Sequence, residues 1–234
     1  EINLERIGMV KGRQYETIIS TKNEDGSKNA APIGVICAGN NKIINRIFKG
    51  SHTLENIIRE REFIVNITHD PELFATSTLG NLPQDYFNED YSIKDMKAYF
   101  KCKVKSLTEA VKQSDPVKKK GEAIVIKSEV CELIIREDTQ ALNRGFGYVI
   151  ESLANLTRFD IVDDTQKEYY LKRFREANRV VLKVGTKEDI KALIPYIKSI
   201  IKQNNILIKK QYYFIYHNLQ NNLQSRMKFI FQYT

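Results

Sequence analysis

Three consecutive segments typical of β-strands lie in YETIISTKNEDGSKNAAPIGVICAGNNKIINRIF, residues Tyr15–Phe48. β-Branched residues fill much of residues 15–21, and after an Asp-Gly turn the extended pattern resumes at residues 28–38 and 42–48. Pro32 interrupts the second segment and has no N–H to donate, so we expect it at a sheet edge or at a bulge. Three strands before any helix favour an antiparallel sheet.

The next segments add further strands and two short helices. Strands are expected at residues 62–68, 99–107 and 122–136. Short helices are expected at residues 53–61 and 70–79, and Asp70 is the expected N-cap of the second. The apolar face of the first short helix would consist of Leu54, Ile57 and Ile58.

After residue 137 the apolar residues recur at helical spacing. They are Leu142, Phe146, Val149, Leu153 and Leu156, and then Leu171, Phe174, Val181 and Val184. Gly185 fits a helix C′ position, and residues 186–189 resemble the capping box of a third helix that ends near Lys202. The sequence therefore predicts an α+β protein, with an antiparallel β-barrel followed by a C-terminal helical subdomain.

The 234 residues divide into three expected parts. Residues 1–138 are expected to form the barrel domain and residues 139–203 the helical subdomain. Residues 204–234 form an atypical tail, dense in Asn, Gln, Tyr and Phe and without Gly, Pro or acid. We expect this tail to pack weakly and to be poorly ordered, or else to dock on another surface.

Composition excludes several classes of protein and site. No run of 18 apolar residues and no secretory signal is present, so we expect a cytoplasmic protein without a membrane span. Cys37, Cys102 and Cys131 lie far apart, so we expect reduced, buried cysteines and no metal site. No complete nucleotide-binding fingerprint occurs; Gly145 and Gly147 lie at a predicted helix start without the rest of the motif.

The net charge of +8 does not indicate a nucleic-acid-binding surface. Half of it comes from the tail, through Lys209, Lys210, Arg226 and Lys228. The lysine-rich stretch at residues 112–120 has no interleaved aromatic residues and is interpreted as a solvated hairpin loop. We therefore expect no nucleic-acid partner.

The best local candidate for a binding site is RIFKGSHT, Arg46–Thr53, just before a predicted helix. A helix start offers unpaired N–H groups and a positive dipole end. Gly50 would allow close approach, Ser51 and Thr53 would add hydroxyl donors, and Lys49 and Arg46 would add positive charge, a combination suited to phosphate. The alternative is that Thr53 is only an N-cap. His52 is expected to face solvent.

A second candidate is the run Asn29, Ala30, Ala31, Pro32, Ile33 and Gly34. Small residues and a proline leave a flat surface with free backbone groups, on which a planar ring could lie. The alternative is an ordinary bulged edge strand.

At these two segments the sequence resembles an archaeal family of previously uncharacterised proteins with the flavin reductase-like, FMN-binding split barrel. The resemblance covers residues 1–202, and its motifs are YETIIST, DGSKNAAPIGV, FKGSHTLENI, VNITHDPELFA and NRGFGYVIESLANLTR. It implies FMN as cofactor and a homodimer with flavin near the interface. The ring would lie along residues 29–34, and the phosphate would be bound by Lys49, Gly50, Ser51 and Thr53, with Arg46 as a further candidate. Arg144 and Arg158 match basic positions that either reach the flavin or pair with Glu151.

The resulting hypothesis is an FMN-binding flavoprotein that acts as an NAD(P)H-dependent flavin reductase or a related oxidoreductase. Reduced nicotinamide would bind transiently on the exposed ring face, and no catalytic side chain is assigned. The alternatives are a non-catalytic flavin-binding or electron-carrier protein, or a basic barrel that binds another phosphate ligand, such as a deazaflavin or pyridoxal phosphate.

Overall fold

The computed structural model describes residues 1–80, 82–111, 122–203, 217 and 220–221. The predicted loop at residues 112–120 and nearly all of the predicted tail at residues 204–234 lie outside these described residues. The chain divides into two compact units, Glu1–Leu142 and Asn143–Thr234.

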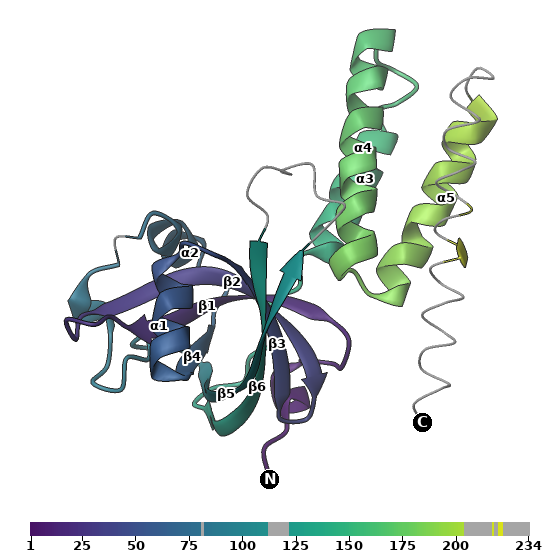
Figure 1. The fold of residues 1–234 in the computed structure, drawn as a ribbon. Helices are drawn as coiled ribbons and strands as arrows, with labels where there is room; N and C mark the ends of the chain where they lie inside the picture. Colours follow the sequence, from purple (N-terminus) through teal and green to yellow (C-terminus); the bar gives the residue numbers. More distant parts are fainter. Residues whose placement is uncertain (81, 112–121, 204–216, 218–219, 222–234) are drawn as a thin grey trace. The chain divides into compact units, whose positions relative to one another are not determined.

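The first unit is a closed antiparallel barrel with strand order β1-β2-β3-β6-β5-β4 (Figure 1). The strands are β1 (Gln14–Lys22), β2 (Lys28–Gly39), β3 (Lys42–Phe48), β4 (Glu62–Ile67), β5 (Ala98–Val111) and β6 (Glu122–Ile135). The unit also contains the short helices η1 (Leu4–Ile7), α1 (His52–Glu60), α2 (Pro71–Thr78) and η2 (Gln84–Tyr86). The predicted antiparallel barrel is confirmed.

Alternation of side chains along the strands creates the barrel core. In β3, Ile43, Asn45 and Ile47 are buried while their neighbours are less so, as expected for a strand with one face inward. Phe63 and Phe100 join this core from β4 and β5. Burial on one face of each strand is the main force that holds the barrel together.

The first half of β2 forms a sheet edge, as Pro32 predicted. The β1–β2 turn closes with a 2.8 Å hydrogen bond from Asn23 N–H to Ser27 O. Hydrogen-bonded and non-hydrogen-bonded residue pairs alternate along an antiparallel ladder. Asn23–Ser27 is a hydrogen-bonded pair, so Ile18–Pro32, five pairs further on, is a non-hydrogen-bonded one, and the missing N–H of Pro32 removes no ladder bond. The ladder between β2 and β3 begins only at Val35. The proline therefore lies at an edge that only β1 pairs.

Helix α1 begins and ends one residue earlier than predicted. Ser51, not Thr53, is its N-cap, and Arg61 ends it with φ of +60°. Leu54 and Ile57 are buried, but Ile58 is 45% exposed, which corrects the predicted apolar face. The prediction for α2 is confirmed, because Asp70 Oδ1 accepts from two N–H groups of its first turn at 2.9 and 3.2 Å.

The second unit contains the helices α3 (Gly145–Leu156), α4 (Asp164–Val184) and α5 (Lys187–Gln203). Its core includes Phe174 and Tyr196, whose rings stack with centroids 4.0 Å apart. Two residues assigned to the first helical face are placed differently: Leu142 precedes the helix, and Phe146 is 64% exposed. The described part of the chain contains no helix that is long and apolar enough to cross a membrane.

The junction between α4 and α5 shows which local predictions were correct. Thr186 and Asp189 form the predicted capping box, with reciprocal side chain–backbone bonds of 2.8 and 3.0 Å. Gly185 follows α4 directly, but its backbone is extended and not left-handed (φ −67°, ψ 162°). Glycine is required there for space, since an added Cβ would lie 2.6 Å from the carbonyl oxygen of Val181.

Candidate functional site

The segment RIFKGSHT, Arg46–Thr53, covers the end of β3, a turn and the first residues of α1. Gly50 has a φ of +84°, which glycine adopts readily. Ser51 Oγ accepts a first-turn N–H at 3.3 Å. The N–H groups of His52 and Thr53 have no acceptor among the described residues. These donors, at the positive end of the helix dipole, favour an anion.

The basic side chains of this segment contribute less than the sequence suggested. Lys49 Nζ lies 2.8 Å from Glu109 Oε1 on β5, so a carboxylate compensates its charge. Arg46 lies on the exposed side of β3. His52 faces solvent, as predicted, with Nδ1 3.7 Å from a carboxylate oxygen of Glu55. Backbone donors and the dipole are therefore the features of this segment best suited to an anion.

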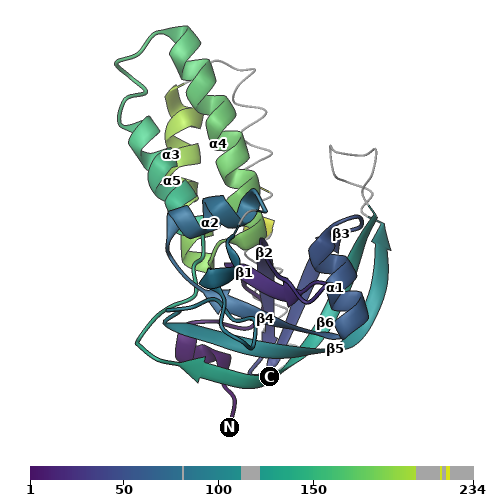
Figure 2. The same cartoon turned by 90° about the vertical axis from the view of Figure 1, so that its left-hand side faces the viewer.

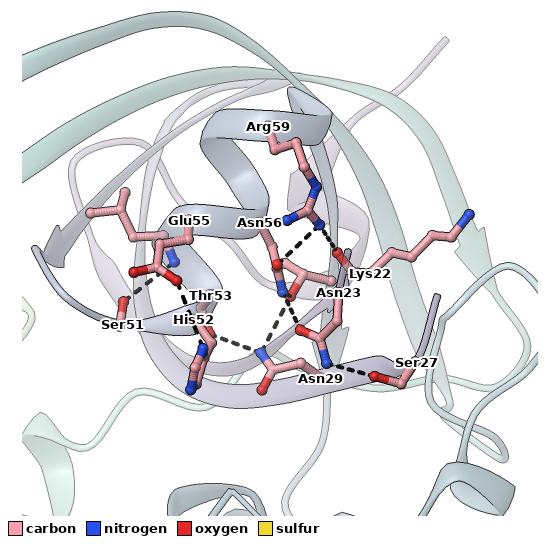
Figure 3. Close-up of polar contacts among 12 residues, drawn as sticks. Lys22, Asn23, Ser27, Asn29, Ser51, His52, Thr53, Glu55, Asn56 and Arg59 are labelled. Atoms are coloured by element: carbon pink, nitrogen blue, oxygen red, sulfur yellow. Dashed lines mark hydrogen bonds and ion pairs between the residues drawn. The ribbon is translucent and has the colours of Figure 1, made fainter. Parts of the chain in front are cut away.

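The two candidate segments meet at a hydrogen bond between Asn29 and Thr53. Asn29 Nδ2 donates to Thr53 Oγ1 at 3.0 Å and to Thr21 Oγ1 at 3.3 Å (Figure 3). Thr53 is only 3% exposed, so its hydroxyl belongs to this buried cluster. The bond fixes the first turn of α1 against the edge of β2.

Asn56 and Arg59, which sequence reasoning missed, extend this cluster along α1. Asn56 Nδ2 donates to Thr21 Oγ1 at 3.0 Å and to Asn23 Oδ1 at 2.7 Å. Arg59 Nη2 donates to Asn56 Oδ1 at 3.1 Å and also bonds the backbone oxygen of Lys22 (Figure 3). The available signal was an Asn within a short helix, a residue that tends to hydrogen-bond backbone or neighbouring side chains.

A hollow of about 500 Å³ is lined by α1, by the β1–β2 turn and by Gly80, Leu82 and Gln84. Asn29, Ala30 and His52 line it, so it contains members of both candidate segments. Residues 31–34 do not line it, although each of them is partly exposed. The second view of the cartoon shows α1 beside the barrel strands (Figure 2).

The edge of β2 carries the free backbone groups that the sequence predicted. The side-chain amide of Gln84 pairs with both backbone groups of Lys28, at 2.7 and 2.8 Å. Because alternate residues of an antiparallel strand direct their backbone groups the same way, Ala30 and Pro32 also present theirs away from β1. Among the described residues these groups have no partner. A polar ring edge could bind them.

The remaining basic candidates belong to the second unit. Arg158 is exposed, and Arg144 interacts electrostatically with Glu176. The expected pairing partner Glu151 is instead bonded by Arg173, with an Nη2–Oε1 distance of 2.6 Å. The expectation that Arg144 or Arg158 pairs with Glu151 is thus wrong.

The cysteines differ in their surroundings. All three are free, and Cys37 and Cys102 are buried, which raises the pKa of both thiols. Cys131 is exposed, which corrects the expectation that it is buried. The described parts of the chain contain no cluster of three or more His, Cys, Asp or Glu side chains arranged to hold a metal ion.

Two family models match the chain over most of its length. The N-terminal domain model of DUF447, a family described as proteins of unknown function, matches residues 15–136, and the second DUF447 model matches residues 143–197. The chain belongs to the DUF447 family. The two matches confirm the family resemblance that the sequence indicated.

This DUF447 chain is similar to three proteins from other organisms. Uncharacterized protein MJ1453 of Methanocaldococcus jannaschii is 26% identical over 74% of this chain and 91% of its own length. The FMN-bound protein MM1853 of Methanosarcina mazei, matched to the same family, is 28% identical over 82% of this chain and 96% of its own, with a TM-score of 0.48. Flavoredoxin of Methanosarcina acetivorans is 16% identical over 53% and 70%, with a TM-score of 0.40.

Proposed function

We propose that this DUF447 protein binds FMN, with the phosphate at the start of α1 and the ring along the edge of β2. The observation that carries the proposal is the Asn29–Thr53 hydrogen bond of 3.0 Å, which joins a helix start suited to an anion to a strand edge with free backbone groups. Membership of DUF447 adds support, because MM1853 of the same family is FMN-bound.

The residues at the helix start fit a phosphate. The N–H groups of His52 and Thr53 would donate to it, and Ser51 would hold the first turn in place, since its hydroxyl accepts from Leu54 N–H and donates to the carbonyl of Phe48. An added Cβ at Gly50 would meet nothing within 4 Å, so the turn is open to an approaching group. Lys49 would share its charge between the phosphate and Glu109.

The edge of β2 fits a flat ring. Ala31 and Pro32 are small or rigid and partly exposed, so a planar ligand would meet little steric hindrance there. At Gly34 the side chain of Gln14 already lies against the strand. The backbone groups of Ala30 and Pro32 would hydrogen-bond the polar edge of the ring. Because the open face of such a ring would be accessible to a second subunit, we also propose a homodimer with the flavin near its interface.

Bound FMN would supply the redox chemistry, accepting a hydride and passing electrons on. We propose an NAD(P)H-dependent flavin reductase or a related oxidoreductase, in which the chain positions the ring and leaves one face open. The alternative is an electron carrier that never reacts with nicotinamide. Steady-state oxidation of NADH and NADPH with added FMN separates the two, since a carrier would give no turnover above free flavin.

The binding proposal is tested with purified protein and a charge placed at the helix start. Ser51→Asp keeps a good N-cap but adds a carboxylate beside the phosphate, whereas Ser51→Asn keeps the cap without charge. We expect FMN to bind wild type at least tenfold more tightly than riboflavin, which lacks the phosphate. We expect Ser51→Asp to weaken the binding of FMN at least tenfold and the binding of riboflavin less than twofold.

Two results would overturn the FMN site. One is colourless protein that does not quench the fluorescence of added FMN. The other is an equal loss of affinity for FMN and riboflavin in Ser51→Asp, while Ser51→Asn binds both as the wild type does, because the charge would then act on something other than a phosphate. Binding of pyridoxal phosphate in place of FMN would favour the alternative of a basic barrel that holds another phosphate ligand.

A further inference from the structure

The hollow beside α1 extends well past the helix start. It follows the helix from His52 to Arg59, which corresponds to about 10 Å of helix. Residues of the β1–β2 turn and Gln84 also line it. A phosphate at the first turn of α1 would occupy one end only, and the rest of the 500 Å³ would remain beyond it. That volume lies in the range of small-molecule sites.

Arg59 is held in place at the far end of the hollow. Its Nε donates to Glu60 at 2.9 Å, and its Nη2 donates to Asn56 and to the backbone of Lys22. Its Nη1 has no acceptor among the described residues. The planar guanidinium is therefore pre-organised, with one nitrogen available, and such a group can stack on an aromatic ring or bind an oxygen.

Asp25 offers a complementary group on the turn. Its Oδ1 accepts from the N–H and the hydroxyl of Ser27, at 2.9 and 2.6 Å. These bonds lower the pKa of the Asp25 carboxyl, so it is ionised at neutral pH. Its Oδ2 has no partner among the described residues. A fixed carboxylate of this kind accepts hydrogen bonds from sugar hydroxyls.

The charges of the hollow narrow the class of ligand. Carboxylates of Glu24, Asp25 and Glu55 line it together with the cations of Lys28 and Arg59. A second free phosphate monoester, largely a dianion at neutral pH, would be repelled by the three carboxylates, whereas the singly charged second phosphate of a dinucleotide would stay beside the first at the helix start. A neutral sugar with an aromatic base suits the mixture, because the carboxylates accept from hydroxyls and the guanidinium stacks on the base.

We propose that the hollow binds a nucleotide joined to the flavin phosphate by a phosphoanhydride bond, so that the protein takes FAD as well as FMN. This inference rests on the proposed flavin site. The flavin half would lie along the edge of β2, both phosphates at the start of α1, and the adenosine between Arg59 and the β1–β2 turn. FMN would leave this second compartment to water.

Isothermal titration of the full chain with FMN and FAD tests the proposal. We expect FAD to bind at least as tightly as FMN. Arg59→Gln should weaken the binding of FAD about tenfold and that of FMN less than twofold. Asp25→Asn, which preserves the shape of the side chain, should weaken the binding of FAD about threefold and leave that of FMN unchanged. Arg6→Gln, an exposed arginine in η1, serves as the matched control and should change neither.

The outcomes separate the two proposals. FMN binding with FAD more than a hundredfold weaker would overturn the nucleotide compartment and leave the FMN site standing. Equal loss of FMN and FAD in Arg59→Gln would also overturn it, because Arg59 would then act on the shared phosphate or on the position of α1. Binding of neither flavin would overturn both proposals.

Discussion

Two glycines in one helix should respond in opposite ways to the same substitution. In α3, an added Cβ at Gly145 would lie 2.7 Å from Gly185 Cα and 3.0 Å from oxygens of Asn143 and Asp189. The nearest atom is backbone, so α3 must move away from the α4–α5 junction, and such overpacking costs about 1–3 kcal/mol. At Gly147 nothing lies within 4 Å.

Gly145→Ala is therefore expected to lower the free energy of unfolding of the helical unit by about 1–3 kcal/mol. Gly147→Ala is expected to raise it by up to about 1 kcal/mol, the usual gain of alanine over glycine within a helix. The two variants would then differ by roughly 1–4 kcal/mol, although both make the same chemical change.

Urea titration with hydrogen exchange of peptides from residues 143–197 measures the difference, because a chain of two units need not unfold in one transition. Equal stabilities within about 0.5 kcal/mol, the usual range for surface substitutions, would refute the close packing of Gly145. The result would also show whether the incomplete glycine motif at Gly145 and Gly147 is explained by packing.

Two further predictions concern α1 and the turn before it. Asn56→Ala removes three hydrogen bonds and should destabilise the barrel unit by about 2–4 kcal/mol, seen as a lower urea midpoint. Glu55 is adjacent and exposed, so Glu55→Ala should change the free energy of unfolding by less than about 0.5 kcal/mol. Similar losses of stability in the two variants would contradict the structural role of Asn56. Gly50→Ala should cost about 1–2 kcal/mol from its φ of +84° alone, whereas a neutral result would mean that the turn can adopt another conformation.

Features that depend on a few neighbouring residues were predictable from the sequence. The turn signal and the alternating strands of Tyr15–Phe48 identify the hairpins, and the pair Thr186 and Asp189 identifies a helix start, because each rule spans four residues or fewer. Pro32 was predictable for the same reason, since its missing N–H restricts it to an unpaired edge. The barrel follows from the number of strands before the first long helix.

Features that depend on distant residues were not predictable. Ile58 and Phe146 fit a helical apolar face by spacing, but burial depends on what lies opposite, which spacing does not reveal. Lys49 looked like a free cation because its partner Glu109 is 60 residues away. Asn29 and Thr53 appeared as separate candidates, and only the closed barrel brings them together across 24 residues.

The ion pair of Lys49 with Glu109 decides how the helix start can hold a phosphate. The two side chains are 39% and 73% exposed, so water screens the pair and its contribution is about 0–1 kcal/mol. A phosphate that also receives N–H bonds from His52 and Thr53 can therefore draw Lys49 away from Glu109 at small cost. The lysine then adds a charge-assisted bond, worth about 1.5–3 kcal/mol, which exceeds what the ion pair loses. The ion pair with Glu109 thus weakens the predicted contribution of Lys49 without removing it, and the backbone donors of α1 remain the part of the proposed site on which phosphate binding would chiefly depend.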